Sequence, residues 1–222
     1  MIYSNIFRMT PAAFFFAALI LFNPLCVGGE EPGADEGERR IEYQSLRYGP
    51  DDELLGYGMH QYDESGRKIS TGWYEPVKGN VGTTKYEYDE DGRLFRESMY
   101  DRTGSMLLGY TDYTYTGKEK LETSSFTAKG VLLSSLTFDY DESGRVSRET
   151  GYGDDGKIRE IILHEYDEEG ILAKSSVYGP KGNDLVSFAL YEHDRMGNRI
   201  KMTVYSPDGS IYWYVRHLWG TP

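Results

Sequence analysis

Apolar and polar residues alternate along short stretches of the chain, and these stretches recur at a nearly fixed period. Tyr86 and Tyr88 alternate with polar residues, which is the two-residue period of a β-strand. An aromatic residue that opens a glycine-containing turn, most often as Tyr-x-x-x-Gly, recurs at spacings of 26, 26, 26, 26, 26 and 27 residues. These aromatic positions are Tyr48, Tyr74, Tyr100, Phe126, Tyr152, Tyr178 and Tyr205. So fixed a period predicts a repeated supersecondary unit.

A second series of turns alternates with the first. Its clearest copy is Tyr88-Asp89-Glu90-Asp91-Gly92-Arg93, and successive copies are 26, 27, 25, 26 and 27 residues apart. The aspartate can hydrogen-bond its own turn, and the glycine can supply a positive φ. We therefore predict structural turn glycines at Gly66, Gly92, Gly144, Gly170 and Gly197. The copies begin at Tyr62, Tyr88, Tyr115, Tyr140, Tyr166 and His193.

The two turn series predict an all-β fold. Seven turns of one kind and six of the other join about 14 short strands in an antiparallel meander of 26-residue hairpin repeats. One single-layer sheet of this many strands would be about 65 Å long, and twist should coil it. The aromatic columns fall on one face, which we expect to be the core. One column is His60, Tyr86, Tyr113, Phe138, His164 and Tyr191, and the other is formed by the residues that begin the Tyr-Asp turns.

The N-terminal region has the pattern of a targeting segment. An apolar stretch at residues 12–22 follows the single charge of Arg8, so residues 1–28 are predicted to be a signal peptide. Plain secretion is the main expectation, and a lipid anchor at Cys26 is the alternative. Residues 29–40 are predicted to be a disordered acidic linker, and residues 41–219 one repeat domain.

Composition limits the partners. The formal net charge is −12 and the pI is about 4.8, which opposes nucleic-acid binding because phosphate contacts need basic patches. No pattern for a membrane-spanning helix or for a cofactor is present, so no membrane span and no cofactor is expected. The partners expected are a glycan or an envelope protein.

The segment Thr84-Lys85-Tyr86-Glu87-Tyr88-Asp89-Glu90-Asp91-Gly92-Arg93-Leu94 resembles the YD (Rhs) repeat, whose pattern is close to Tyr-x-Tyr-Asp-x-x-Gly-Arg-Leu. Tyr-rich MORN-like repeats are a weaker resemblance. The YD resemblance implies a curved β-sheet on an exported bacterial protein, often described as carbohydrate-binding. Larger members enclose a C-terminal toxin, for which residues 216–222 leave no room.

Three functional classes remain open from the sequence. The first is a non-enzymatic binding or scaffolding module at the bacterial envelope, for which Trp73, Trp213 and Trp219 are the candidate ligand-binding residues, because sugar faces stack on aromatic rings. The second is a component or remnant of a larger Rhs-type toxin-delivery or surface assembly that acts by protein contacts. The third is a glycoside hydrolase that uses turn carboxylates.

The carboxylates do not favour the third class. They occupy repeated turn positions, whereas a catalytic residue should break a repeat, so no catalytic residue is assigned and the protein is expected not to be an enzyme. Acidic turns such as residues 89–92 lack the full calcium-loop pattern, so no metal site is assigned. The histidines mostly replace aromatic positions and are interpreted as structural.

Overall fold

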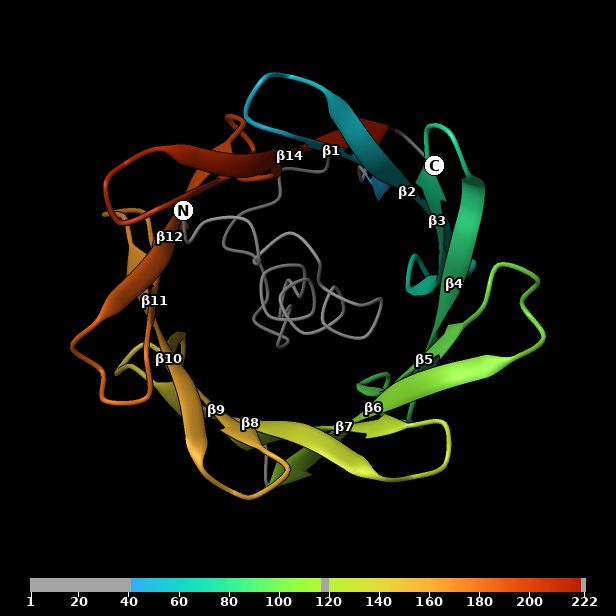
Figure 1. Cartoon of the computed structure of the whole chain (residues 1–222), viewed down its shortest axis with the longest axis horizontal. Coiled ribbons are helices and arrows are strands. Elements are labelled where there is room, and N and C mark those ends of the chain that lie inside the picture. The colour runs from blue at the N-terminus through green and yellow to red at the C-terminus, as the bar shows by residue number, and fades with distance from the viewer. Residues whose placement is uncertain (1–40, 117–119, 221–222) are drawn as a thin grey trace, which may run out of the picture. The chain divides into compact units, whose positions relative to one another are not determined.

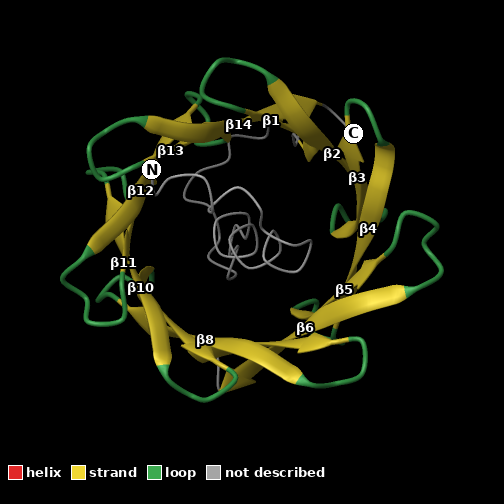
Figure 2. Cartoon of the chain, in the orientation of Figure 1, coloured by secondary structure: helices red, strands yellow, loops and turns green. Residues whose placement is uncertain are grey.

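The computed structural model describes residues 41–116 and 120–220, and in these residues fourteen β-strands form a closed barrel (Figures 1 and 2). The predicted signal peptide, acidic linker and Cys26 anchor lie outside the described residues. The strands are β1 (Ile41–Tyr48), β2 (Leu54–Tyr62), β3 (Lys68–Glu75), β4 (Gly79–Tyr88), β5 (Leu94–Tyr100), β6 (Leu107–Thr116), β7 (Lys120–Thr127), β8 (Leu132–Tyr140), β9 (Val146–Gly153), β10 (Ile158–Tyr166), β11 (Leu172–Tyr178), β12 (Leu185–His193), β13 (Arg199–Tyr205) and β14 (Ile211–Gly220).

The meander of fourteen antiparallel strands is confirmed, and the coil of the sheet is complete. Each strand pairs with its neighbours in sequence, and β1 pairs with β14 in the register Ser45↔His217 and Tyr48↔Tyr214. The two strands that could have been open edges for strand addition therefore pair with each other. Closure removes the unpaired backbone groups that make sheet edges prone to association.

The Tyr-Asp turns hold their shape through aspartate and glycine. Asp89 Oδ1 accepts hydrogen bonds from the backbone N–H of Asp91 at 3.0 Å and of Arg93 at 2.8 Å. Gly92 has a φ of 78°, a left-handed conformation that favours glycine. The equivalent glycines also have positive φ, with values of 80° at Gly66, 76° at Gly144, 82° at Gly170 and 83° at Gly197. We call this end of the barrel the Tyr-Asp end.

The arginine of the motif connects one repeat to the next. Arg93 Nε donates to Asp89 Oδ2 at 2.9 Å, and its guanidinium lies 5.2 Å from the ring centroid of Tyr115 in the following repeat. Arg145 repeats both contacts, with Asp141 at 2.8 Å and with the Tyr166 ring at 4.4 Å. Neighbouring repeats are therefore coupled through side chains as well as through the strand ladder.

The tyrosine of the motif closes the open end of a hairpin. Tyr88, at the end of β4, donates its hydroxyl proton to the backbone O of Lys68, at the start of β3, over 2.8 Å. Tyr115 and Tyr166 make the same bond to the first residue of the preceding strand, at 2.9 and 2.8 Å. These carbonyls lie where the hairpin ladder ends, so each tyrosine satisfies a backbone acceptor that would otherwise need water.

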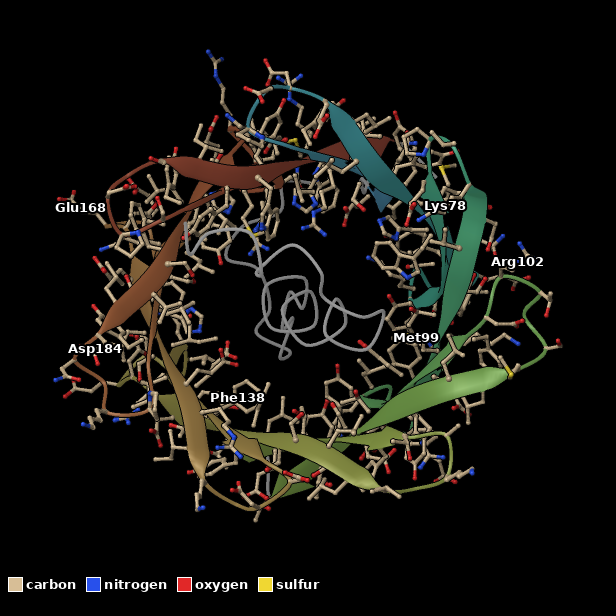
Figure 3. The ribbon with its side chains drawn as sticks, viewed as in Figure 1. Lys78, Met99, Arg102, Phe138, Glu168 and Asp184 are labelled. Carbon is tan, nitrogen blue, oxygen red and sulfur yellow. The ribbon has the colours of Figure 1, made fainter. Side chains whose placement is uncertain are left out.

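The strand register separates an inner face from an outer face. Figure 3 shows Phe138 on the inside of the barrel. The two predicted aromatic columns lie two residues apart along the strands, so both lie on this inner side. Phe138 is 4% exposed and Ile162 is 1% exposed, so the expected core lies on the inner face. The outer face carries the other aromatic series in stacked pairs, such as Tyr57 and Tyr74 with ring centroids 5.0 Å apart.

Candidate binding site on the inner face

Each repeat places one cross-strand pair at the middle of the inner face. The even-numbered strands contribute an aromatic ring or a histidine, and the odd-numbered strands contribute a hydroxyl, a carboxylate or a methionine directly opposite. The pairs are Ser45↔His217, His60↔Thr71, Tyr86↔Glu97, Tyr113↔Thr123, Phe138↔Glu149, His164↔Ser175 and Tyr191↔Met202. The core is therefore amphipathic, since rings and hydrogen-bonding groups alternate around it.

Two of these pairs extend into hydrogen-bonded chains. His164 contacts Glu149 Oε1 through Nε2 and Ser175 Oγ through Nδ1, each at 2.8 Å, and Ser175 Oγ is 3.0 Å from the hydroxyl of Tyr191. Glu149 and Ser175 are 7% and 0% exposed. Hydrogen bonds offset the cost of burying these polar groups. These contacts join β9, β10, β11 and β12 on the inner face.

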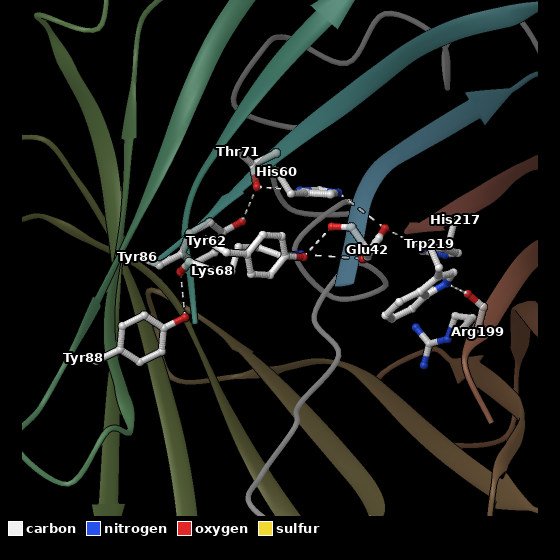
Figure 4. A network of polar contacts seen from close by, with 10 residues as sticks. All are labelled: Glu42, His60, Tyr62, Lys68, Thr71, Tyr86, Tyr88, Arg199, His217 and Trp219. Atoms are coloured by element: carbon white, nitrogen blue, oxygen red, sulfur yellow. Dashed lines mark hydrogen bonds and ion pairs between the residues drawn. The ribbon is translucent and has the colours of Figure 1, made fainter. Parts of the chain in front are cut away.

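The second hydrogen-bonded network crosses the seam, where β1 pairs with β14 and closes the barrel (Figure 4). Glu42 Oε1, on β1, lies 2.7 Å from His217 Nδ1 on β14 and 3.4 Å from His60 Nε2 on β2. The ammonium of Lys68 lies 3.6 Å from Glu42 Oε2. His60 Nδ1 is in turn 2.9 Å from Thr71 Oγ1. One carboxylate therefore joins four strands around the β1–β14 seam.

The surroundings of Glu42 determine its charge. Burial alone would raise the pKa of Glu42, but the hydrogen bond from His217, the nearby imidazole of His60 and the charge of Lys68 outweigh it and hold that pKa well below its usual value. Burial also lowers the pKa of His60. Glu42 is therefore an anion at neutral pH.

Two of the three tryptophans predicted to bind ligand lie on β14 at the seam, and the third lies on β3, which β2 separates from β1. The register assigns Trp73 on β3, and Trp213 and Trp219 on β14, to the inner face, and all three are half-buried. Trp73 and Trp213 lie toward the end of the barrel opposite the Tyr-Asp turns, whereas Trp219 lies toward the Tyr-Asp end.

Each tryptophan is held in place. Trp73 Nε1 donates to Thr84 Oγ1 at 2.9 Å, and Trp219 Nε1 donates to the backbone O of Arg199 at 2.8 Å. The guanidinium of Arg47 lies 4.5 Å from the ring centroid of Trp213. Gly58 leaves room for the Trp73 ring, because a Cβ at this position would lie 3.1 Å from ring atom Cζ3. The structure thus brings Trp73 and Trp213 to one mouth and separates Trp219 from them.

Glu97 on the inner face is a polar residue that the sequence analysis did not single out. Burial raises the pKa of Glu97 to about 7, and a hydrogen bond from Tyr113 opposes this only in part. A sequence signal existed, because Glu97 and Glu149 interrupt a column that otherwise holds hydroxyl residues or methionine. That column is Ser45, Thr71, Glu97, Thr123, Glu149, Ser175 and Met202.

The turn carboxylates are engaged in the turns themselves. The pKa of Asp141 is below its usual value because Arg145 donates to it through its side chain and its backbone. A glycosidase needs a general acid with a raised pKa, which such a carboxylate cannot supply. The contacts of these carboxylates therefore explain them as residues that form the turns.

Within residues 41–116 and 120–220, no group of three or more His, Cys, Asp or Glu side chains could hold a metal ion. In the same part of the chain, no helix is long and apolar enough to cross a membrane.

Comparisons with known proteins give distant structural likenesses. No family model matches the sequence, and no curated protein matches it. A porin-like protein from Bacteroides uniformis is similar with a TM-score of 0.47 and 13% identity, over 84% of this chain and 99% of that one. A porin-like protein from Bacteroides vulgatus is similar with a TM-score of 0.46 and 10% identity, over 83% of this chain and 100% of that one.

Proposed function

We propose that the protein is an exported, non-enzymatic binding protein of the bacterial envelope, and that it binds a carbohydrate at the inner wall formed by β14, β1, β2 and β3. The observation that carries the proposal is the gathering of Trp73 and Trp213 at one mouth of the barrel, with Arg47 stacked on Trp213. Half-buried indole rings offer flat apolar surfaces, and the C–H faces of sugars stack on such surfaces.

The surrounding wall supplies the polar part of such a site. His60, His217 and the Glu42 carboxylate lie deeper on the same strands, and hydroxyl-rich ligands need donors and acceptors together. Barrel mouths are common positions for small-molecule sites. The interior of a barrel of about eight strands is just filled by side chains, and this barrel has fourteen strands and therefore a wider interior. The resemblance to YD repeats, which are often described as carbohydrate-binding, supports the same ligand class.

Intrinsic fluorescence tests the proposal directly, because the chain has three tryptophans and all of them lie on this wall. Titration with maltohexaose, cellohexaose, xylohexaose and chitohexaose should give a saturable emission change with at least one of them. Trp73→Leu or Trp213→Leu should weaken binding at least tenfold, whereas Trp219→Phe should weaken it less. An unchanged emission with every oligosaccharide, from a protein shown to be folded by circular dichroism, would contradict the proposal.

A second candidate is an assembly component that acts by protein contacts. The observation that favours it is a row of exposed apolar side chains at the end opposite the Tyr-Asp turns, including Val77 (97% exposed), Val131 (60%) and Met106 (58%). Such residues can mark protein–protein contact sites. Val77→Ser and Val131→Ser should then reduce co-purification of an envelope partner from the native host without changing the fluorescence titration.

A further inference from the structure

Three neighbouring hairpin turns at the end opposite the Tyr-Asp turns expose apolar side chains. We call them the apolar turns; they join β3 to β4, β5 to β6 and β7 to β8, at residues 76–78, 101–106 and 128–131. Val77 is 97% exposed, Met106 58% and Val131 60%. The other four turns at this end contain no valine, leucine, isoleucine or methionine: residues 49–53, 154–157, 179–184 and 206–210. The apolar surface therefore belongs to one sector of the rim and is not a property of the repeat.

Each apolar turn also carries one basic side chain: Lys78, Arg102 and Lys129. Figure 3 shows Lys78 and Arg102 on adjacent hairpins. The one acidic residue within these turns, Asp101, accepts hydrogen bonds from its own turn, and Lys78 pairs with Glu75 at the end of β3, with Nζ 2.6 Å from Oε2. The other four turns hold seven acidic and two basic residues. Basic and apolar side chains therefore coincide in one sector of a rim that is otherwise acidic.

The outer face behind the apolar turns continues in layers toward the Tyr-Asp end. One exposed aliphatic residue follows on each hairpin: Val81 (37%), Leu108 (41%) and Leu133 (37%). Aromatic rings come next, such as Tyr110 and Phe126, which stack with their centroids 5.0 Å apart. Lys85 Nζ lies 4.7 Å from the ring centroid of Tyr100. The order along the barrel axis is therefore aliphatic, then aromatic with cations beside the rings.

This order matches the change in polarity across a lipid surface. Aliphatic side chains favour the boundary with the acyl chains, and tyrosine rings favour the level of the headgroups, because each ring has an apolar body and a polar tip. Lysine and arginine extend their charged heads toward phosphates while their stems stay on apolar surface. A protein partner fits less well, because lysine is depleted from the cores of protein interfaces and the apolar turns expose no aromatic anchor.

We propose that the apolar turns dock the protein on an anionic lipid surface. Val77, Met106 and Val131 enter the boundary between headgroups and acyl chains, and the basic residue of each turn lies against the lipid phosphates. The contact is peripheral, and it uses other residues than the inner wall, so it adds a lipid partner to the proposed function. It also assigns to lipid the three side chains that the second candidate function assigns to a protein.

A polarity-sensitive fluorophore on a single thiol tests the contact at one residue at a time. The thiol would come from Val77→Cys or, as the matched control on an acidic turn, from Asp154→Cys, each in a Cys26→Ser background of the full chain; both positions are exposed. Vesicles of three parts phosphatidylcholine to one part phosphatidylglycerol should shift the emission of the probe at position 77 to shorter wavelength and leave the probe at position 154 unchanged. The comparison of positions excludes a signal from residues 12–22, whose apolar stretch can itself bind lipid.

Charge substitutions test the headgroup contact. Lys78→Gln with Arg102→Gln and Lys129→Gln should raise the lipid concentration needed for half of the shift at position 77 at least tenfold, because each basic residue near an anionic surface adds attraction. Lys157→Gln with Lys181→Gln removes the two basic residues of the other turns and should leave it unchanged.

Four results would overturn the proposal, with the fold of each variant checked by circular dichroism. They are no shift at position 77, an equal shift at both positions, an equal shift with phosphatidylcholine alone, and a shift at position 77 that needs an envelope protein extract in place of lipid. The last result would assign the apolar turns to a protein partner.

Discussion

Gly144 shows how a single backbone conformation holds the repeat. Its φ is 76°, and an added Cβ would meet no atom within 4 Å, so the cost of a side chain here is conformational and not steric crowding. Gly144→Val places a β-branched residue in a region that such residues avoid. We expect a loss of about 1–3 kcal/mol in the free energy of unfolding, measured by urea melts.

Glu142 provides the control for that prediction. It is an exposed residue of the same turn, so Glu142→Ala should change the free energy of unfolding by less than about 0.5 kcal/mol. If Gly144→Val were as stable as the parent, the glycines would not be the pivots of these turns.

Glu97 gives a prediction about pH. Its pKa is raised to about 7 in the folded state, whereas the unfolded chain has a value near 4.5. A carboxyl whose folded pKa is raised favours the folded state when protonated, so its destabilising effect grows as pH rises from about 4.5 to 7. Glu97→Gln should therefore gain stability relative to the parent at pH 7.5 and little at pH 4.5.

Glu42 should affect the pH dependence of stability in the opposite direction to Glu97, which distinguishes the two carboxylates. Its pKa is lowered in the folded state, so it stabilises the fold above its unfolded pKa, and this contribution is lost as pH falls below that value. Glu42→Gln should destabilise the protein at pH 7.5. Equal pH dependence of the two variants in urea melts would contradict the assigned environments.

Residue-level prediction from the sequence succeeded where chemistry is local. Asp89 and Gly92 have roles that their own backbone dictates, and the structure shows the expected hydrogen bonds and φ. The partner of Glu97 across the hairpin could not be predicted, because the β4–β5 register contains a bulge, and a shift of one residue moves side chains between faces. The contact between Glu42 and His217 joins residues 175 positions apart, and no local pattern indicates it.

The hairpin repeat is the element that the sequence specifies most fully. Its two turns, its alternating strands and the Asp–Arg–Tyr contact all lie within about one period of 26 residues. Stability in such arrays depends on contacts between neighbours, so a whole unit can be lost while the contacts of the others remain.

Deletions test this modularity. Removing residues 100–125 takes away one 26-residue unit and two strands, so twelve antiparallel strands can still close, and circular dichroism should show a folded protein. Removing 13 residues takes away one strand, and the first and last strands of the remainder would then meet in parallel. That deletion should abolish cooperative thermal melting. Equal damage from both deletions would show that the units are not equivalent.

At the scale of the whole molecule, closure is the property that local patterns leave undetermined. Twist and strand number predict a coiled sheet, but whether β1 meets β14 depends on tilt and stagger summed over all the strands. The β1–β14 pair is also the one neighbouring pair among the described strands that no short turn connects. Side chains therefore help to hold β1 against β14. Glu42 bonds His217 across the seam, and the rings of Tyr48 and Tyr214 stack with their centroids 4.9 Å apart.

A disulfide across the seam is the measurement that tests the closed barrel most directly. Leu46 and Arg216 are direct partners on the outer face, so Leu46→Cys with Arg216→Cys, in a Cys26→Ser background, should form an intramolecular disulfide on mild oxidation. Leu46→Cys with Ser124→Cys, which places the second thiol on β7 across the barrel, should not. In an open sheet β1 and β14 would be about 65 Å apart. Mass spectrometry that found no intramolecular disulfide in the first variant would contradict the closed fourteen-strand barrel.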